Sequence, residues 1–430
     1  MTKSIAIIGT LDTKKAEGYY LKEQIEMFHH IPILIDVSLR KHGGHKVKAD
    51  ISNEAIAGTA GTSIDEVSLR ERGESIELMT KGASKIVKEL YETRRIDGII
   101  GYGGSIGLAI TSSVMKSLPF GFPKVIVTTI AGVAWKYIEA KDIVVFPSIT
   151  DLVGGERINR IEAITLANAA GAISGMVDAK PTLPPQKPLV VVSQFGVTTP
   201  HVQASREILE NRGYEVVAFH AVGTGGQSLE ELVKSGVAAG VLDVTTHEIA
   251  DELVGGVCRA GSNRLESAGE NGIPQVILPG ALDMVNFYEP ETVPEKFRHR
   301  RFYIHNPKVT LMRTTADECA ELGKIIAGKV NKASGPTVVL VPGAGWSEYD
   351  KKGGVVTVDY SGRKTDQPWY DPEADAAFIK SLQDHVDHSK TNIEVIITEQ
   401  HINDPRLAEL SASILVDMIK GKWKRGKKYS

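Results

Sequence analysis

Residues 120–132 read FGFPKVIVTTIAG, and residues 270–282 read ENGIPQVILPGAL. Each stretch has Gly-x-Pro before an apolar run that ends in small residues, which is typical of a buried parallel strand. Two further pairs of stretches are alike, and they are PSIT at 147–150 with PKVT at 307–310, and AAGAISGMV at 169–177 with LGKIIAGKV at 322–330. One architectural unit therefore occurs twice, which predicts two α/β lobes that arose by internal duplication.

Length and composition favour a two-domain soluble protein. A chain of 430 residues exceeds the usual size of a single core, and 42% hydrophobic with 24% charged residues is ordinary for a globular protein. The net charge of −3 argues against binding to nucleic acid, and no stretch is long enough to span a bilayer. The two cysteines, Cys258 and Cys319, have no metal-ligand spacing and fit a reducing compartment. We expect a cytoplasmic protein without a membrane or nucleic-acid partner.

Strand-like and helix-like segments alternate through both halves of the chain, which predicts mainly parallel sheets with helices on both faces. The stretch DAKPTLPPQKP at 178–188 has four prolines in eleven residues and can continue neither a helix nor a central strand. We expect a first lobe over 1–180, a linker over 181–188 and a second lobe over 189–430. Residues 40–75 are polar and irregular, so a flap or functional loop is expected there.

The first candidate site is the loop that follows the apolar run at 4–9. A strand end, a Gly/Thr loop and a helix start would present free backbone amides and the positive end of a helix dipole, which suits a phosphate. An ordinary turn in which Asp12 or Thr13 caps the helix explains the same residues. The candidate binding residues here are Gly9, Thr10, Asp12, Thr13 and Lys14.

The loop GYGGSIG at 101–107 also follows a strand and begins a helix. Glycines there let the backbone approach a ligand closely, although the loop is neither a Walker A motif nor the dinucleotide fingerprint. A tight packing turn is the alternative. The candidate binding residues here are Gly103, Gly104, Ser105 and Gly107.

Three more residues lie at the predicted strand ends of the first lobe. Asp36 ends the second strand, where an acidic side chain can bind ribose hydroxyls or simply act as a cap. Thr128 and Thr129 end the fourth strand and are expected to face the same crevice.

The second lobe has more reactive side chains at its predicted strand ends. Four successive strands end in polar residues, and such convergence at one edge of a sheet is typical of an active site. These residue types serve in acid–base catalysis or hold a divalent ion, although no pair has a diagnostic metal spacing. Each one is alternatively a satisfied structural side chain. The candidate catalytic residues are His220, Glu248, Asp283 and His305.

Together these stretches resemble the family of the tomato mosaic virus resistance protein, in its N-terminal Tm-one-like ATP-binding domain. The resemblance implies two Rossmann-like lobes, ATP binding with or without magnesium, and a homodimer. The family pattern Gly-Gly-Ser-Gly-Gly-Thr has Ile106 and Leu108 here in place of a Gly and the Thr. The stretches that carry the resemblance are IAIIGTLDTK at 5–14, GYGGSIGLA at 101–109, NRIEAITLANAAGAISGM at 159–176, FGVTTPHVQASREILENRGYEV at 195–216, FHAVGTGG at 219–226, PGALDMVNF at 279–287, HNPKVTLMRTT at 305–315 and HINDP at 401–405.

Three functions agree with these observations. The first is an ATP-binding enzyme with the nucleotide in the first lobe and an unknown small substrate in the cleft between the lobes. The second is a nucleotide-dependent binding or regulatory module without turnover. The third is an ATP-independent hydrolase or lyase whose site lies in the second lobe.

Overall fold

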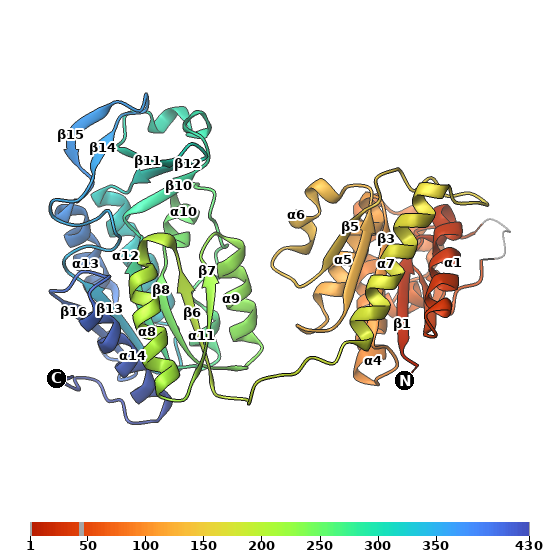
Figure 1. The fold of residues 1–430 in the computed structure, drawn as a ribbon, viewed down its shortest axis with the longest axis horizontal. Helices are drawn as coiled ribbons and strands as arrows, with labels where there is room; N and C mark the ends of the chain where they lie inside the picture. The colour runs from red at the N-terminus through yellow and green to blue at the C-terminus, as the bar shows by residue number, and fades with distance from the viewer. Residues whose placement is uncertain (1, 43–46, 430) are drawn as a thin grey trace. The chain divides into compact units, whose positions relative to one another are not determined.

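The structure, a computed structural model, describes residues 2–42 and 47–429. The chain divides into two compact units, Met1–Thr182 and Leu183–Ser430, each with its own sheet and core. Both units are α/β folds with a mainly parallel sheet (Figure 1).

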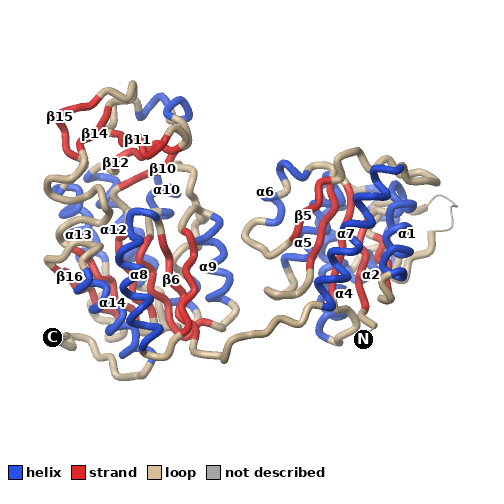
Figure 2. Tube along the Cα trace, viewed as in Figure 1, coloured by secondary structure: helices blue, strands red, loops and turns tan. Residues whose placement is uncertain are grey.

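The first unit has a five-stranded, fully parallel sheet in the order β2-β1-β3-β4-β5. Its helices cover both faces of the sheet (Figure 2). Its elements are β1 (Ser4–Gly9), α1 (Leu11–Met27), β2 (Ile31–Asp36), α2 (Asn53–Ala60), α3 (Ile64–Leu69), α4 (Arg72–Glu92), β3 (Gly98–Gly103), α5 (Ser105–Lys116), β4 (Lys124–Thr128), α6 (Trp135–Ile138), β5 (Val144–Pro147) and α7 (Arg160–Asp178).

Alternation along the strands builds a core on each face of this sheet. In β1, Ile5 and Ile7 pack in one cluster with residues of α1 and α7, while Ala6 and Ile8 pack in the other with residues of α2, α4 and α5. Because both faces are buried, the strand is a continuous apolar run in the sequence. This architecture leaves the carboxyl ends of the strands, where α1, α4 and α5 begin, as the place for a ligand.

The segment 40–75 is more regular than the sequence suggested. Its described residues form α2, α3 and the first turn of α4, and the cap of α3 is a complete capping box between Ser63 and Glu66. The expectation of a flap over this whole segment was therefore wrong. The short helices were missed because each has only six to eight residues, too few for a clear helical period.

The second unit has a six-stranded parallel sheet in the order β16-β13-β9-β8-β6-β7. The elements of this sheet and its helices are β6 (Leu189–Gln194), α8 (Thr199–Asn211), β7 (Glu215–His220), α9 (Thr224–Lys234), β8 (Ala238–Thr245), α10 (Glu248–Val254), α11 (Ser267–Glu270), β9 (Gln275–Gly280), α12 (Ala316–Val330), β13 (Thr337–Pro342), α13 (Pro372–His385), β16 (Ile393–Thr398) and α14 (Pro405–Ile419).

A separate antiparallel sheet is inserted into the second unit. Its order is β10-β12-β11-β14-β15, and its strands interrupt the connections from β9 to α12 and from β13 to α13. It lies across the carboxyl end of the parallel strands (Figure 1). Residues 302–306, which carry the catalytic candidate His305, form β11 and pair antiparallel with β12 in this sheet. The inserted strands are β10 (Met284–Phe287), β11 (Phe302–Asn306), β12 (Val309–Arg313), β14 (Val356–Val358) and β15 (Lys364–Pro368).

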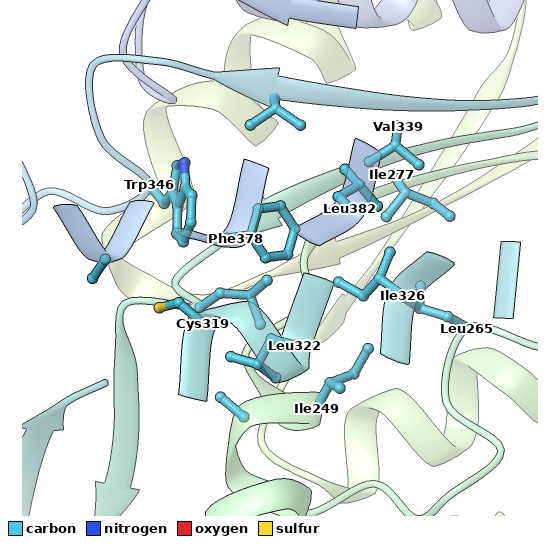
Figure 3. Packing of buried hydrophobic residues seen from close by; sticks show 14 of the residues in the cluster. Ile249, Leu265, Ile277, Cys319, Leu322, Ile326, Val339, Trp346, Phe378 and Leu382 are labelled. Carbon is cyan, nitrogen blue, oxygen red and sulfur yellow. The ribbon is translucent and has the colours of Figure 1, made fainter. Parts of the chain in front are cut away.

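The largest core of the second unit lies between one face of its parallel sheet and α10, α12 and α13. Phe378 meets Trp346 edge to face at 5.0 Å between ring centroids, and Leu322 and Leu382 are fully buried beside them (Figure 3). Trp346 follows β13, so this core also fixes the loop after that strand.

Five strands follow the same order in the two parallel sheets, as expected for an internal repeat. β2-β1-β3-β4-β5 in the first unit corresponds to β7-β6-β8-β9-β13 in the second. The like stretches at 120–132 and 270–282 contain the equivalent strands β4 and β9. The other two pairs are not equivalent in structure, since 307–310 lies in the inserted sheet, and α7 follows β5 whereas α12 precedes β13. The first pair alone marks structurally matching strands.

Candidate functional site

A pocket of about 330 Å³ opens in the first unit, where the chain leaves β1 and β3. It joins four segments that are far apart in the sequence: the start of α1, the loop after β2, the start of α4 and the start of α5. The residues that line it are Thr10, Asp12, Thr13, Lys14, Leu39, Arg40, Arg72, Gly104, Ser105, Ile106 and Gly107.

The start of α5 presents unused hydrogen-bond donors to this pocket. Gly104 is the N-cap and has no capping side chain. Within the part of the chain that the structure describes, no hydrogen bond engages the amides of Ser105, Ile106 and Gly107. The first amides of a helix are its unsatisfied donors and carry the positive end of its dipole, so this end suits an anion.

The glycines of this loop are required by its backbone. Gly103 has φ +147°, and a Cβ there would lie 3.0 Å from the Cα of Gly107. A Cβ at Gly107 would lie 2.9 Å from the carbonyl oxygen of Tyr102. At Gly104, in contrast, the nearest atom to a Cβ would be Thr129 Oγ1 at 3.6 Å, an ordinary contact. Gly103 and Gly107 make the tight turn, and Gly104 leaves the mouth of the pocket open.

The start of α1 is different, because the protein itself already engages its amides. The Leu11 amide donates to Asp36 at 3.2 Å, and the Asp12 amide donates to Ser38 Oγ at 2.9 Å. The Lys14 amide donates to the Thr10 carbonyl, and Lys14 Nζ donates to the Leu152 carbonyl. The expectation of free amides in this loop was therefore wrong, although its side chains do line the pocket.

Asp36 acts as the cap of α1 from a neighbouring strand. The side chain is 1% exposed. Its Oδ1 accepts hydrogen bonds from the Leu11 amide and from the amide and hydroxyl of Ser38, and its Oδ2 lies 2.5 Å from His42 Nε2. Asp36 was expected either to bind ribose hydroxyls or to act as a cap, and this geometry is that of a cap. Binding of a ribose by Asp36 stays a prediction.

Four other predicted binding residues lie outside the pocket lining. A Cβ at Gly9 would overlap the ring of Tyr102, so this glycine serves packing. Gly103 shapes the turn, and Thr128 is buried and accepts a hydrogen bond from the Ile130 amide. Thr129 lies next to Gly104 without lining the pocket.

The sequence reasoning missed the two arginines of the site. Arg40 follows β2, and Arg72 is the first residue of α4. Neither guanidinium has a carboxylate partner among the described residues. A cation in the first turn of a helix is electrostatically unfavourable, so the position of Arg72 was a usable signal once α4 was recognised.

In the second unit, Glu248 is part of a buried ionic network around Arg264. The guanidinium contacts Glu248 at 2.7 Å, Asp243 at 2.5 Å and Glu230 at 3.2 Å, and all four side chains are buried. Glu248 also accepts the amides of Gly223 and Gly226 at the start of α9. Burial raises the pKa of Glu248, whereas Arg264 opposes that rise.

Asp283 lies in a second buried network, beneath the inserted sheet. It accepts Ser347 Oγ at 2.8 Å and Trp369 Nε1 at 2.7 Å through Oδ2, while Oδ1 has no partner among the described residues. Burial and the charge of Asp350 raise its pKa, and Arg313 opposes that rise. Arg313 also contacts Asp350 at 3.4 Å and Asp375 at 3.0 Å.

The candidate histidines occupy separate surroundings. His220 is exposed at the end of the edge strand β7, and its ring stacks on Phe195 at 5.6 Å between centroids. His305 lies in the antiparallel sheet, with Nδ1 2.8 Å from the Tyr349 hydroxyl. His305 is linked to the Asp283 network, because the Tyr349 amide donates to Ser347 Oγ, which in turn donates to Asp283. Glu248 belongs to the separate network of Arg264, and the roles of all four catalytic candidates stay predictions. Within residues 2–42 and 47–429, no group of three His, Cys, Asp or Glu side chains is placed to hold a metal.

Two family models cover nearly the whole chain. The N-terminal domain of the uncharacterised protein family UPF0261 matches residues 3–182, and the C-terminal domain of the same family matches residues 187–419. The chain belongs to the UPF0261 family. A UPF0261 protein of Clostridium tetani is 43% identical over 422 residues, which is 97% of this chain and 100% of the relative.

The family likeness extends to a plant protein. A ToMV resistance protein of Solanum lycopersicum, Tm-1(GCR237), is 39% identical over 344 residues, which covers 78% of this chain and 43% of the tomato protein. Among solved structures, the Staphylococcus aureus MnaA-UDP co-structure aligns with 64% of this chain and 79% of its own, at a TM-score of 0.23 and 9% identity. A TM-score this low carries no information on ligand or activity.

No helix among the described residues combines the length and the hydrophobicity that a membrane span requires.

Proposed function

We propose that this protein binds the phosphate chain of a nucleotide, ATP in the first place, in the pocket of its first unit. The observation that carries the proposal is the pairing of two uncompensated arginines, Arg40 and Arg72, with the open amides of α5 in one pocket. Arginine fits phosphate oxygens with two parallel hydrogen bonds, and a helix start adds amide donors.

The second unit supports this proposal by comparison. Glu248 is the first residue of α10, as Ser105 is the first residue of α5, and both helices follow the equivalent strands β8 and β3. The Glu248 carboxylate reaches from α10 to the start of α9 and also binds Arg264. In the first unit the corresponding space, between the starts of α5 and α4, is the pocket. We infer that in the first unit an external anion binds between the starts of α5 and α4, in the position that the Glu248 carboxylate occupies in the second unit.

The resemblance to the Tm-one-like ATP-binding family supports ATP as the nucleotide. The size of the pocket agrees with this choice, because ligand sites begin at about 300 Å³. Catalysis is not part of the proposal, since Glu248 and Asp283 are buried and engaged in the protein's own networks.

The test is isothermal titration calorimetry of the full chain with ATP and magnesium. Arg72→Ala and Arg40→Ala should each weaken ATP binding by about tenfold or more, because a hydrogen bond to a charged group is worth about 1.5–3 kcal/mol. Ser105→Glu should abolish binding, because it places a carboxylate where the second unit has Glu248. The ribose prediction for Asp36 is tested in the same titration by replacing ATP with its 2′-deoxy analogue.

The matched control is Lys88→Ala, which removes one positive charge from the exposed side of the same helix as Arg72. It should leave the affinity for ATP unchanged. The proposal is wrong if wild-type protein does not bind ATP, or if Lys88→Ala weakens binding as much as Arg72→Ala does.

A further inference from the structure

The residues that line the pocket narrow the class of ligand, and this inference rests on the proposed function. We propose that the pocket recognises a diphosphate group and leaves the base unread, so that its ligand class is any nucleoside di- or triphosphate and inorganic pyrophosphate.

The donors of the pocket are numerous and come from different sides. The amides of Ser105 and Ile106 belong to α5, whereas Arg40 belongs to the loop after β2 and Arg72 to the start of α4. Three cationic side chains, Lys14, Arg40 and Arg72, line the pocket together with one carboxylate, Asp12. A diphosphate brings more negative charge and more acceptor oxygens to these donors than a single phosphate does, which favours a diphosphate.

Each guanidinium is free to bind the ligand. Arg70, close to Arg72 in sequence, pairs with Glu74 on the surface at 3.4 Å. Arg40 has its carbonyl oxygen held by Asn53 at 2.9 Å, which fixes the backbone while the side chain makes no ion pair within the described residues. The loop is therefore anchored, and the charged end of Arg40 is available.

The lining offers little that could read a base. Its apolar side chains are Leu39 and Ile106, and among the described lining residues there is no aromatic ring to stack on a base. It also has no Asn or Gln among those residues, the side chains that pair with the edge of adenine. Both apolar residues are partly buried against the core beside α2 and α5, so they form walls of the phosphate site.

The test is a calorimetric titration of the full chain with six ligands at saturating magnesium: ATP, GTP, CTP, pyrophosphate, AMP and inorganic phosphate. We expect the first four to bind with dissociation constants within about fivefold of one another, and AMP and phosphate to bind at least about tenfold more weakly. Arg72→Ala should weaken the four strong ligands by a common factor, and Lys88→Ala should change none of them.

Two results would overturn the inference while ATP still binds. One is a preference for ATP over GTP and CTP of more than about fivefold, and the other is a failure of pyrophosphate to compete with ATP. If no ligand binds, ATP included, the proposed function itself fails, so the two failures are distinguishable.

Discussion

The amide of Ser105 is the most specific donor that the proposed site has, and one pair of substitutions isolates it. Ser105 is the first residue of α5, and neither its amide nor its hydroxyl has a partner among the described residues. Ser105→Ala removes the hydroxyl only, and Ser105→Pro removes the hydroxyl and the amide proton. The difference between the two variants therefore measures the amide.

The fold should accept the proline. The first position of a helix favours proline, because its missing N–H has no helical partner there. The preceding Gly104 is extended, with φ −85° and ψ −150°, and so avoids the α region that proline disfavours at the residue before it, and the Ser105 side chain is exposed. We expect the melting temperature of Ser105→Pro to equal or slightly exceed that of wild type.

The affinity of Ser105→Pro for ATP, in contrast, should fall. A hydrogen bond to a charged phosphate contributes about 1.5–3 kcal/mol, so Ser105→Pro should bind ATP about 10- to 150-fold more weakly than Ser105→Ala. Isothermal titration calorimetry of both variants measures this ratio directly. Equal dissociation constants for the two variants would refute the role of the α5 amides, provided that both remain folded by circular dichroism.

Three further outcomes are expected. Arg264→Ala should lower the free energy of unfolding by about 3–5 kcal/mol in urea denaturation, because three buried carboxylates lose their counter-charge, while Arg206→Ala, at an exposed pair with Glu210, should cost less than about 1 kcal/mol. Burial raises the pKa of Asp251 to about 7, so between about pH 4 and 7 the folded state holds more protons than the unfolded state, and stability falls as pH rises. Asp251→Asn, neutral throughout, should reduce the slope of that fall by up to about 1.4 kcal/mol per pH unit, and an unchanged slope in a urea series would contradict the assignment. Asp12 lines the pocket and would repel phosphate unless a cation lies between them. Asp12→Asn should therefore bind ATP more tightly than wild type in EDTA, and magnesium should raise its affinity for ATP by a smaller factor. An unaltered magnesium dependence in calorimetry would exclude a role of Asp12 in holding the cation.

The sequence located much of the pocket but missed its two arginines. Seven of its lining residues were predicted from two loops, because a glycine-rich turn between a strand and a helix is visible in local sequence. Arg40 and Arg72 were missed, since nothing local shows that a loop after β2 and the start of α4 meet those turns. The homodimer, the cytoplasmic location and the bound magnesium stay predictions.

The second unit shows the converse error. Strand-end side chains such as Glu248 and Asp283 were expected to converge on an active site, yet each is buried and bonded to partners such as Arg264 and Ser347, although Asp283 Oδ1 has no partner among the described residues. Those partners lie 16 and 64 residues away in the chain. The inserted antiparallel sheet that covers this edge was also missed, because its strands are short and resemble those of a parallel sheet in local pattern.

Hydrophobic periodicity and turn residues, which are local properties of the chain, determined two α/β units with parallel sheets, and the like stretches at 120–132 and 270–282 marked one pair of equivalent strands. The strand order that the two sheets share came from the tertiary structure. The tertiary structure alone decided which polar residues remain open to a ligand. In the second unit an internal carboxylate, Glu248, fills the space between two helix starts, and in the first unit Ser105 leaves that space open beside two arginines. The reason is physical: whether a charge or an amide is free depends on partners brought close only by folding.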